Sequence, residues 1–240
     1  MSHEILGGVE VYRAEPAGKS LGVVILIHEI WGLVDHICRV ADRYAASGFT
    51  VIAPDLMSSI GITPKIGVDL MAMMMEPDEQ KRLASQTFLR ESLAPVNAPE
   101  FAAAALEMLT SIVDALEAQG HERVAVLGFC FGGTYSFALA AQDARVVAAV
   151  PFYGSGPTDE KIAQIECPVL AFYGEIDPPI MGDFARVEAS MKASGIEFEA
   201  HVYPNVQHAF FNDTNVARFD RAARDDAWAR SVAFLKAKLA

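Results

Sequence analysis

The stretch Gly128-Phe129-Cys130-Phe131-Gly132-Gly133 decides the fold of this chain. It follows an apolar run at 123–127 that predicts a buried strand, and it precedes residues 134–141, which predict a helix. Glycines two positions before and after a nucleophilic side chain, between strand and helix, form the G-x-S-x-G elbow with cysteine in place of serine. The turn is tight, so small residues flank it where backbone segments come close. We therefore expect Cys130 above a sheet, at a helix N-terminus that stabilises a thiolate and a developing oxyanion.

Length and composition predict one domain, residues 1–240. The chain is 52% hydrophobic and 21% charged, which favours a sizeable core over disorder. Its formal net charge of −12 argues against bulk nucleic-acid binding, because that function needs a basic surface. An anionic substrate would need a local positive group.

The first residues lack the basic and apolar regions of a signal peptide, and no early apolar run is long enough to span a membrane. The three cysteines, Cys38, Cys130 and Cys167, make an odd count without paired spacing. We therefore expect a reducing cytoplasm and no disulfide framework. No Cys/His spacing is typical of a zinc site, so the sequence predicts no metal.

Apolar runs alternate with helical patterns along the chain. The predicted strands are 21–28, 50–53, 123–127, 146–152, 168–173 and 198–203, and 10–13 is an expected antiparallel edge strand. The predicted helices are 35–47, 100–119, 132–142, 182–194 and 215–239. Runs without alternation suit parallel strands covered on both faces, so we expect an α/β fold with a mostly parallel, doubly wound sheet. Residues 56–99 fit least well and are expected to be an irregular excursion near the pocket, its methionines packed in the core or walling that pocket.

Polar side chains follow two of the predicted strands. Asp177 comes after 168–173 and His208 after 198–203, and active sites of open α/β sheets lie beyond the carboxyl ends of the strands. With Cys130, the chain order is nucleophile, acid, base, which is the α/β-hydrolase order. Alone, each of the three has an ordinary structural explanation, as a small hydrophobe, a turn residue or a surface histidine. Their shared order, each behind its own strand, favours a catalytic triad.

The chemistry gives each member of this triad a role. His208 takes the thiol proton and later protonates the leaving alkoxide, Asp177 orients and stabilises the imidazole, and Cys130 forms the acyl intermediate. Two backbone N–H groups should bind the oxyanion. One belongs to Phe131, and the other should come from the loop after 21–28, where we expect Ile30. His28, at the end of that strand, is expected to make structural hydrogen bonds.

With these residues placed, the chain resembles the dienelactone hydrolase family over nearly its full length. The resemblance rests on His28-Glu29-Ile30-Trp31-Gly32, Ala53-Pro54-Asp55-Leu56, the elbow, Phe152-Tyr153-Gly154, Gly174-Glu175-Ile176-Asp177 and His208-Ala209-Phe210. It implies a monomeric α/β-hydrolase without a cofactor that acts on small carboxylic esters or lactones. The type reaction of the family opens 4-carboxymethylenebut-2-en-4-olide to maleylacetate.

The resemblance also implies a role for Glu29, which would hold the resting thiol neutral and take its proton when substrate arrives. The alternative is a loop carboxylate bonded to backbone amides. Trp31 would line the pocket or pack its loop. The family carries a carboxylate-binding arginine four positions after the histidine, where this chain has Asn212, and a second arginine in the excursion, where Arg82 is the candidate. Phe210 and Phe211 favour a more apolar pocket.

We therefore expect a cysteine-dependent hydrolase of small esters or lactones. A broader carboxylesterase, a thioesterase or an acyltransferase on the same triad is the alternative, followed by a non-catalytic ligand-binding module. A small-molecule substrate is the only partner expected, with neither nucleic acid nor membrane.

Overall fold

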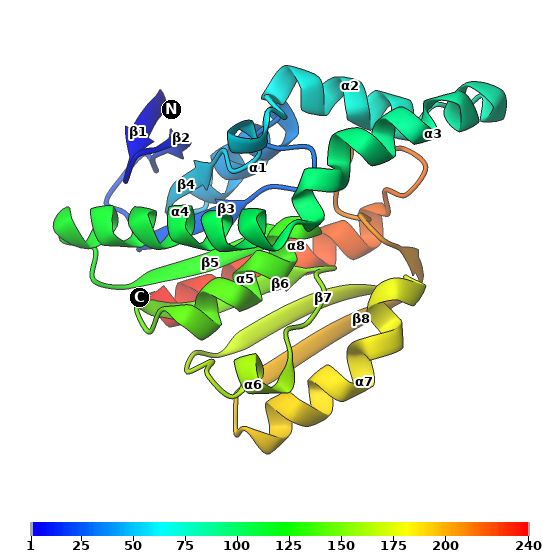
Figure 1. The fold of residues 1–240 in the computed structure, drawn as a ribbon. Helices are drawn as coiled ribbons and strands as arrows, with labels where there is room; N and C mark the ends of the chain where they lie inside the picture. The colour runs from blue at the N-terminus through cyan, green and yellow to red at the C-terminus, as the bar shows by residue number, and fades with distance from the viewer. Residues whose placement is uncertain (1, 240) are drawn as a thin grey trace.

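The apolar runs of the chain form the middle of one eight-stranded sheet. In the computed structural model, which describes residues 2–239, the strand order is β1-β2-β4-β3-β5-β6-β7-β8 (Figure 1). The strands are β1 (Ser2–Leu6), β2 (Val9–Ala14), β3 (Val23–Ile27), β4 (Thr50–Pro54), β5 (Val124–Phe129), β6 (Val146–Phe152), β7 (Val169–Ile176) and β8 (Phe198–Gln207). The six strands from β3 to β8 are parallel, and the β1–β2 hairpin adds an antiparallel edge. The predicted α/β class with a mostly parallel sheet is confirmed.

Helices cover both faces of this sheet. They are α1 (Asp35–Ala46), α2 (Pro64–Met74), α3 (Glu79–Leu93), α4 (Pro99–Ala118), α5 (Phe131–Gln142), α6 (Asp159–Ile162), α7 (Pro178–Ala193) and α8 (Arg221–Leu239), with short 3-10 turns at Ser58–Ile60 and Ala94–Asn97. In Figure 1, α8 passes behind the sheet, whereas α4, α5 and α7 lie in front of it. All residues of β3, β4 and β5 are buried, because both faces are covered.

The excursion at 56–99 is helical, which corrects the expected irregular conformation. Thr63 caps α2 by accepting the Ile66 N–H, and Asp78 caps α3 by accepting the Lys81 N–H. Sequence reasoning missed both helices because α2 buries only Gly67 and Leu70, and α3 only Leu89, so neither has the apolar stripe that identifies a packed helix. Figure 1 shows α2 and α3 together above the sheet.

The expected helix boundaries in the last third of the chain were also displaced. The helix predicted from 182 begins at Pro178, because two prolines occupy its first positions and fit a helix N-terminus. The helix predicted from 215 begins at Arg221, where the Asp220 carboxylate accepts the Ala223 N–H. Residues 216–218 form a turn instead, and 215, 219 and 220 have no regular structure. As a result, the segment between His208 and α8 is a loop.

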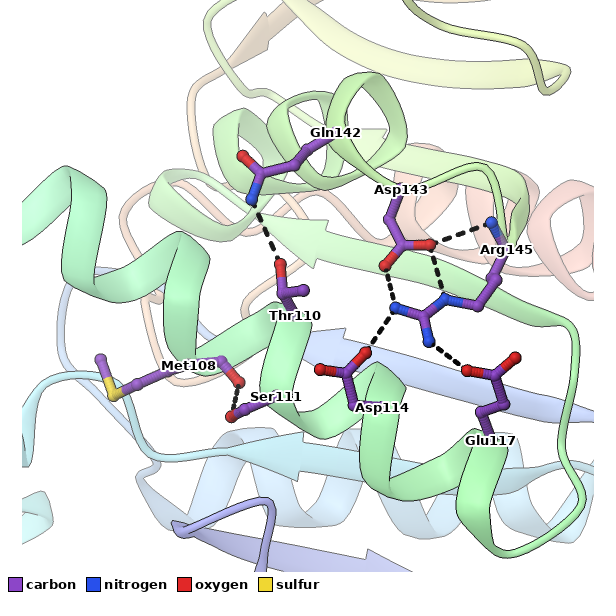
Figure 2. Close-up of polar contacts among 8 residues, drawn as sticks. All are labelled: Met108, Thr110, Ser111, Asp114, Glu117, Gln142, Asp143 and Arg145. Atoms are coloured by element: carbon purple, nitrogen blue, oxygen red, sulfur yellow. Dashed lines mark hydrogen bonds and ion pairs between the residues drawn. The ribbon is translucent and has the colours of Figure 1, made fainter.

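A polar cluster lies at the amino ends of the parallel strands. Arg145 directly precedes β6 and makes two side-chain hydrogen bonds to Asp143, of 2.9 and 2.6 Å. The same guanidinium reaches Asp114 and Glu117 of α4, as Figure 2 shows. These bonds hold the pKa of the largely buried Asp143 carboxyl below its ordinary value. The cluster therefore ties α4 to the turn between α5 and β6.

Candidate active site

The turn between β5 and α5 holds Cys130 in a strained conformation. Its backbone has φ 56° and ψ −114°, a region that side-chain-bearing residues rarely adopt. Two backbone hydrogen bonds hold this turn, from Cys130 N to Phe152 O at 3.0 Å and from Gly132 N to His28 O at 3.1 Å. The half-buried thiol is thus presented at the end of β5, directly before the first residue of α5.

The glycines around Cys130 are required by close backbone contacts. A Cβ on Gly128 would lie 2.1 Å from the Gly132 carbonyl oxygen, and one on Gly132 would lie 2.2 Å from that of Ile27. A Cβ on Gly133 would lie 2.5 Å from the Phe152 carbonyl oxygen. Since backbone atoms cannot move aside, any larger residue would displace α5 from the sheet. The expected reason for the glycine spacing therefore holds at atomic detail.

Strand register brings the predicted acid and base together. Ile176 and Gln207 are partners across β7 and β8, so Asp177 and His208 leave the sheet side by side. The His208 Nδ1 atom lies 2.6 Å from Asp177 Oδ2. Asp177 is 5% exposed, and the His208 side chain is 24% exposed. Asp177 is thus a largely buried partner for a histidine that still reaches solvent.

His208 also interacts with Cys130, the predicted nucleophile. Burial lowers the pKa of His208, but its hydrogen bond with Asp177 and its interaction with the nearby Cys130 outweigh that effect and raise the pKa to about 10. An imidazole whose pKa is raised in this way is suited to hold the thiol proton, because the Asp177 carboxylate and a thiolate at Cys130 both favour its charged form. The structure therefore pairs His208 with Asp177 and brings Cys130, the third residue predicted from the chain order, close to the imidazole.

The two amides expected to bind an oxyanion have no hydrogen-bond acceptor within residues 2–239. Within residues 2–239, neither the Ile30 N–H nor the Phe131 N–H donates a hydrogen bond to the protein. Phe131 is the first residue of α5, so its amide belongs to the unsatisfied first turn of that helix. Ile30 follows β3 in the neighbouring loop. Neither donor is therefore used by an acceptor within residues 2–239.

Glu29 is a buried carboxyl group next to this constellation. It is 3% exposed, and its Oε2 atom accepts a hydrogen bond of 2.6 Å from Asn212 Nδ2. Its Oε1 atom lies 3.3 Å from the Tyr153 hydroxyl. Burial raises the pKa of Glu29 above its ordinary value, although the Asn212 hydrogen bond and the His208 charge act in the opposite direction. The hydrogen-bond partners of Glu29 are thus side chains. The alternative, a loop carboxylate bonded to backbone amides, does not match this arrangement.

His28 has a structural role. The Leu56 N–H donates to His28 Nε2 at 3.1 Å, so Nε2 must be the unprotonated nitrogen. Nδ1 therefore carries the hydrogen and donates to the Glu29 carbonyl oxygen at 2.7 Å. The histidine is fully buried, and burial lowers its pKa. It links the loop after β3 to the loop after β4, as the sequence predicted.

The four residues expected to touch substrate lie at different depths. Phe210 is fully buried against Tyr153 and Tyr203. Trp31 is also buried, and its carbonyl oxygen lies so close to Gly67 of α2 that a Cβ there would be only 1.8 Å away. Arg82 lies on α3 and donates to the Glu76 carbonyl oxygen at 3.0 Å.

Asn212, the fourth of these residues, is 1% exposed and engaged with Glu29.

A cavity of about 360 Å³ opens beside His208. Its wall is formed by Ile176, Asp177, Pro178, Pro179, Ile180, Gln207, His208 and Arg218. Arg218 is exposed, and its side chain makes no hydrogen bond or ion pair within residues 2–239. Since Asp177 is engaged by His208, Arg218 supplies the uncompensated charge of this wall.

Sequence reasoning missed Tyr153 and Arg218 as parts of the site. Tyr153 has φ 39°, is buried, and packs its ring 4.9 Å from that of His208. Its position directly after β6 was the available signal, because the other site residues also follow strands. Arg218 carried no local signal, since it lies in the segment that the sequence predicted as helix.

Comparisons with known proteins agree with this geometry. A sequence model described as "Dienelactone hydrolase family" matches residues 9–239. The chain belongs to the dienelactone hydrolase family. A Synechocystis protein named "Putative carboxymethylenebutenolidase" is 30% identical over 90% of this chain and 87% of its own length. A Saccharolobus solfataricus protein of the same name is 29% identical over 95% of this chain and 93% of its own.

Solved structures support the same assignment. The crystal structure titled "Putative Dienelactone Hydrolase" from Klebsiella pneumoniae is 26% identical, has a TM-score of 0.75, and is matched over 94% of this chain and 91% of its own. A dienelactone hydrolase from Anabaena variabilis, at 16% identity and a TM-score of 0.65, shares the fold. This dienelactone hydrolase family member is therefore a hydrolase with the α/β-hydrolase fold.

Residues 2–239 contain no group of three or more His, Cys, Asp or Glu side chains placed to hold a metal ion. None of their helices combines the length and the apolar character needed to cross a bilayer.

Proposed function

We propose that this protein hydrolyses small carboxylic esters or lactones through an acyl-enzyme on Cys130. The observation that carries this proposal is the 2.6 Å contact between His208 and Asp177, with Cys130 near enough to raise the pKa of His208, at the carboxyl ends of three parallel strands. A nucleophile, a base and an orienting carboxylate in this order are what acyl transfer needs. Family membership supports the reaction class.

The first half of the reaction forms the acyl-enzyme. Cys130 gives its thiol proton to His208, and the sulfur forms a bond to the carbonyl carbon of the ester. The carbonyl oxygen becomes an oxyanion beside the Ile30 and Phe131 amides, which have no internal acceptor. The C–O bond of the ester then breaks, and His208 returns the proton to the leaving alkoxide. In a lactone, the alkoxide stays tethered to the acyl group, so the step opens the ring.

The second half releases the acid. A water molecule gives a proton to His208 and attacks the thioester carbon, and the C–S bond breaks. Cys130 leaves as a thiolate and takes the proton back from His208. Asp177 stabilises the imidazolium in both halves through its 2.6 Å contact with Nδ1. No oxidant, reductant or cofactor is required for this balance.

Glu29 contributes charge close to the base. Its carboxylate favours the protonated form of His208, since the two groups interact in the site. Within residues 2–239, no hydrogen bond joins Glu29 to Cys130, because the carboxyl oxygens face Asn212 and Tyr153. For Glu29 to take the thiol proton when substrate arrives, as the family resemblance implies, its carboxyl must therefore release one of these two partners.

Steady-state turnover of p-nitrophenyl acetate tests the proposal. Cys130→Ala should abolish turnover while the circular dichroism spectrum stays that of the wild type. Cys167→Ala is the matched control, because Cys167 is a buried free thiol before the start of β7, whereas Asp177 follows the end of that strand. It should keep the wild-type rate. Unchanged turnover in Cys130→Ala would overturn the proposed function.

A further inference from the structure

The loop after His208 carries Asn212, whose side chain is directed at Glu29. Asn212 lies four positions beyond the histidine and is 1% exposed. Backbone hydrogen bonds from Asn212 N to Ala209 O and from Asn215 N to Asn212 O, both 3.1 Å, hold this loop in consecutive turns. Ala209 has φ 63°, which lets the chain reverse directly after His208. The loop thus fixes His208 and Asn212 relative to each other.

The orientation of the Asn212 amide is fixed by Thr214. The Thr214 backbone N–H donates to Asn212 Oδ1 at 3.0 Å, and the Thr214 hydroxyl donates to the same oxygen at 2.6 Å. A backbone N–H is only a donor, so the atom that faces it must be the amide oxygen. The amide nitrogen is therefore the atom that lies 2.6 Å from Glu29 Oε2.

We propose that Asn212 is a positioning residue that caps Glu29 Oε2 with an N–H donor, so that Oε1 is the only atom of Glu29 able to carry a proton. Oε1 faces the Tyr153 hydroxyl, which can donate to the carboxylate or accept from the neutral acid. Asn212 is itself uncharged. It therefore orients the carboxyl group without forcing it to ionise. A guanidinium in its place would force ionisation.

The groups around Glu29 have opposing effects on its pKa, so its protonation depends on the Asn212 hydrogen bond. Burial raises the pKa of Glu29, whereas Asn212, Tyr153 and the charges of His208 and Arg218 lower it. The neighbouring Asp213 faces outward and pairs with His36 at 3.3 Å. Since the donors and cations act against burial, removing the Asn212 donor shifts the balance toward neutral Glu29. The inference deepens the proposed function, because it assigns what controls the carboxyl group beside the base.

The test measures the protonation of Glu29 directly, by the infrared carbonyl band of a neutral carboxylic acid followed against pH. Glu29→Gln identifies the band by removing it. Asn212→Leu takes away the N–H donor, so the band should persist to a pH at least about one unit higher than in the wild type. Asn212→Asp keeps the side-chain shape but places two carboxyl groups together, and it should shift the band in the same direction.

Matched variants keep the test decisive. Asn215→Leu changes a buried asparagine of the same loop whose side chain makes no hydrogen bond within residues 2–239, and it should leave the band at the wild-type pH. Thr214→Val removes one of the two donors that orient the amide, and it should give a smaller upward shift. If Asn212→Leu does not fold, Asn212→Asp and Thr214→Val carry the test.

An unchanged band midpoint in folded Asn212→Asp would overturn the inference. So would an equal shift in Asn215→Leu. The infrared measurement needs no turnover, so it is independent of the Cys130→Ala assay. An inactive nucleophile would remove the proposed function and leave this assignment standing, whereas an unmoved band would remove only the assignment.

Discussion

The Nδ1 atom of His208 lies 2.6 Å from Oδ2 of Asp177 because the residues before them, Gln207 and Ile176, are paired across β8 and β7. The proposed acid and base are thus placed by strand register, with no intervening loop residue. Gly174 permits this approach, since a Cβ there would lie 2.5 Å from the Val206 carbonyl oxygen. Sites built on strands hold their geometry more tightly than sites built on loops.

Asp177→Asn tests the role of the acid. The amide keeps the shape of the side chain but cannot stabilise an imidazolium, so kcat/KM for p-nitrophenyl acetate should fall by about 10³-fold or more. The thermal unfolding midpoint should change little. A loss smaller than tenfold in a folded variant would mean that Asp177 does not support the base.

The protonation of His208 depends on Cys130 as well as on Asp177. Burial lowers the pKa of His208, and the contacts with Asp177 and Cys130 raise it to about 10, so Cys130→Ala should lower it. Because the pKa in the folded state exceeds the ordinary 6.5, the stability that His208 contributes is complete below pH 6.5. That contribution is lost as the pH rises through 10. NMR titration of the His208 imidazole checks the shift, and an identical titration in Cys130→Ala would contradict the contact.

Gly132→Ala tests the close packing of the elbow. The added methyl group would meet the Ile27 carbonyl oxygen at 2.2 Å, so the variant should lose about 2 kcal/mol of stability or more and most of its activity. Gly182→Ala is the control, because nothing lies within 4 Å of a Cβ at that helical position. It should be neutral or slightly stabilising, by up to about 1 kcal/mol. Equal unfolding midpoints for the two variants would show that the turn at Cys130 does not require glycine at position 132.

Arg218 should favour substrates that carry a negative charge. It supplies the uncompensated charge on the wall of the cavity beside His208. Arg218→Ala should raise KM for an anionic aryl ester about fivefold and leave KM for a neutral ester unchanged. Arg221→Ala removes the same charge from an exposed residue that does not line the cavity. A similar effect of both variants would show that only the overall charge matters.

Local patterns were sufficient to predict the centre of this fold and the candidate triad. The continuous apolar runs identified the buried parallel strands, and the glycine spacing identified the turn at Cys130. Asp177 and His208 were singled out because each comes shortly after a predicted strand, 168–173 or 198–203; the observed strands β7 and β8 run on to Ile176 and Gln207. The features that sequence reasoning missed depend on contacts between distant segments or on weakly buried elements.

The Asn212–Glu29 hydrogen bond joins residues 183 positions apart, so no spacing could indicate it. Position alone predicted Asn212 as a substrate contact, because the family places a binding residue there. The structure instead shows its amide directed at Glu29. Similarly, α3 was missed because it buries only Leu89, and β1 because only Leu6 of its five residues is buried.

The proposed mechanism requires the Cys130 sulfur to carry the acyl group during turnover. Intact-mass spectrometry of protein quenched within one turnover of p-nitrophenyl acetate tests it most directly, with peptide mapping to locate the adduct. We predict a single acetyl group on Cys130 in the wild type, with more of it accumulating in a variant slowed at His208. An acetyl group on another residue, or full turnover with Cys130 replaced by alanine, would contradict the account.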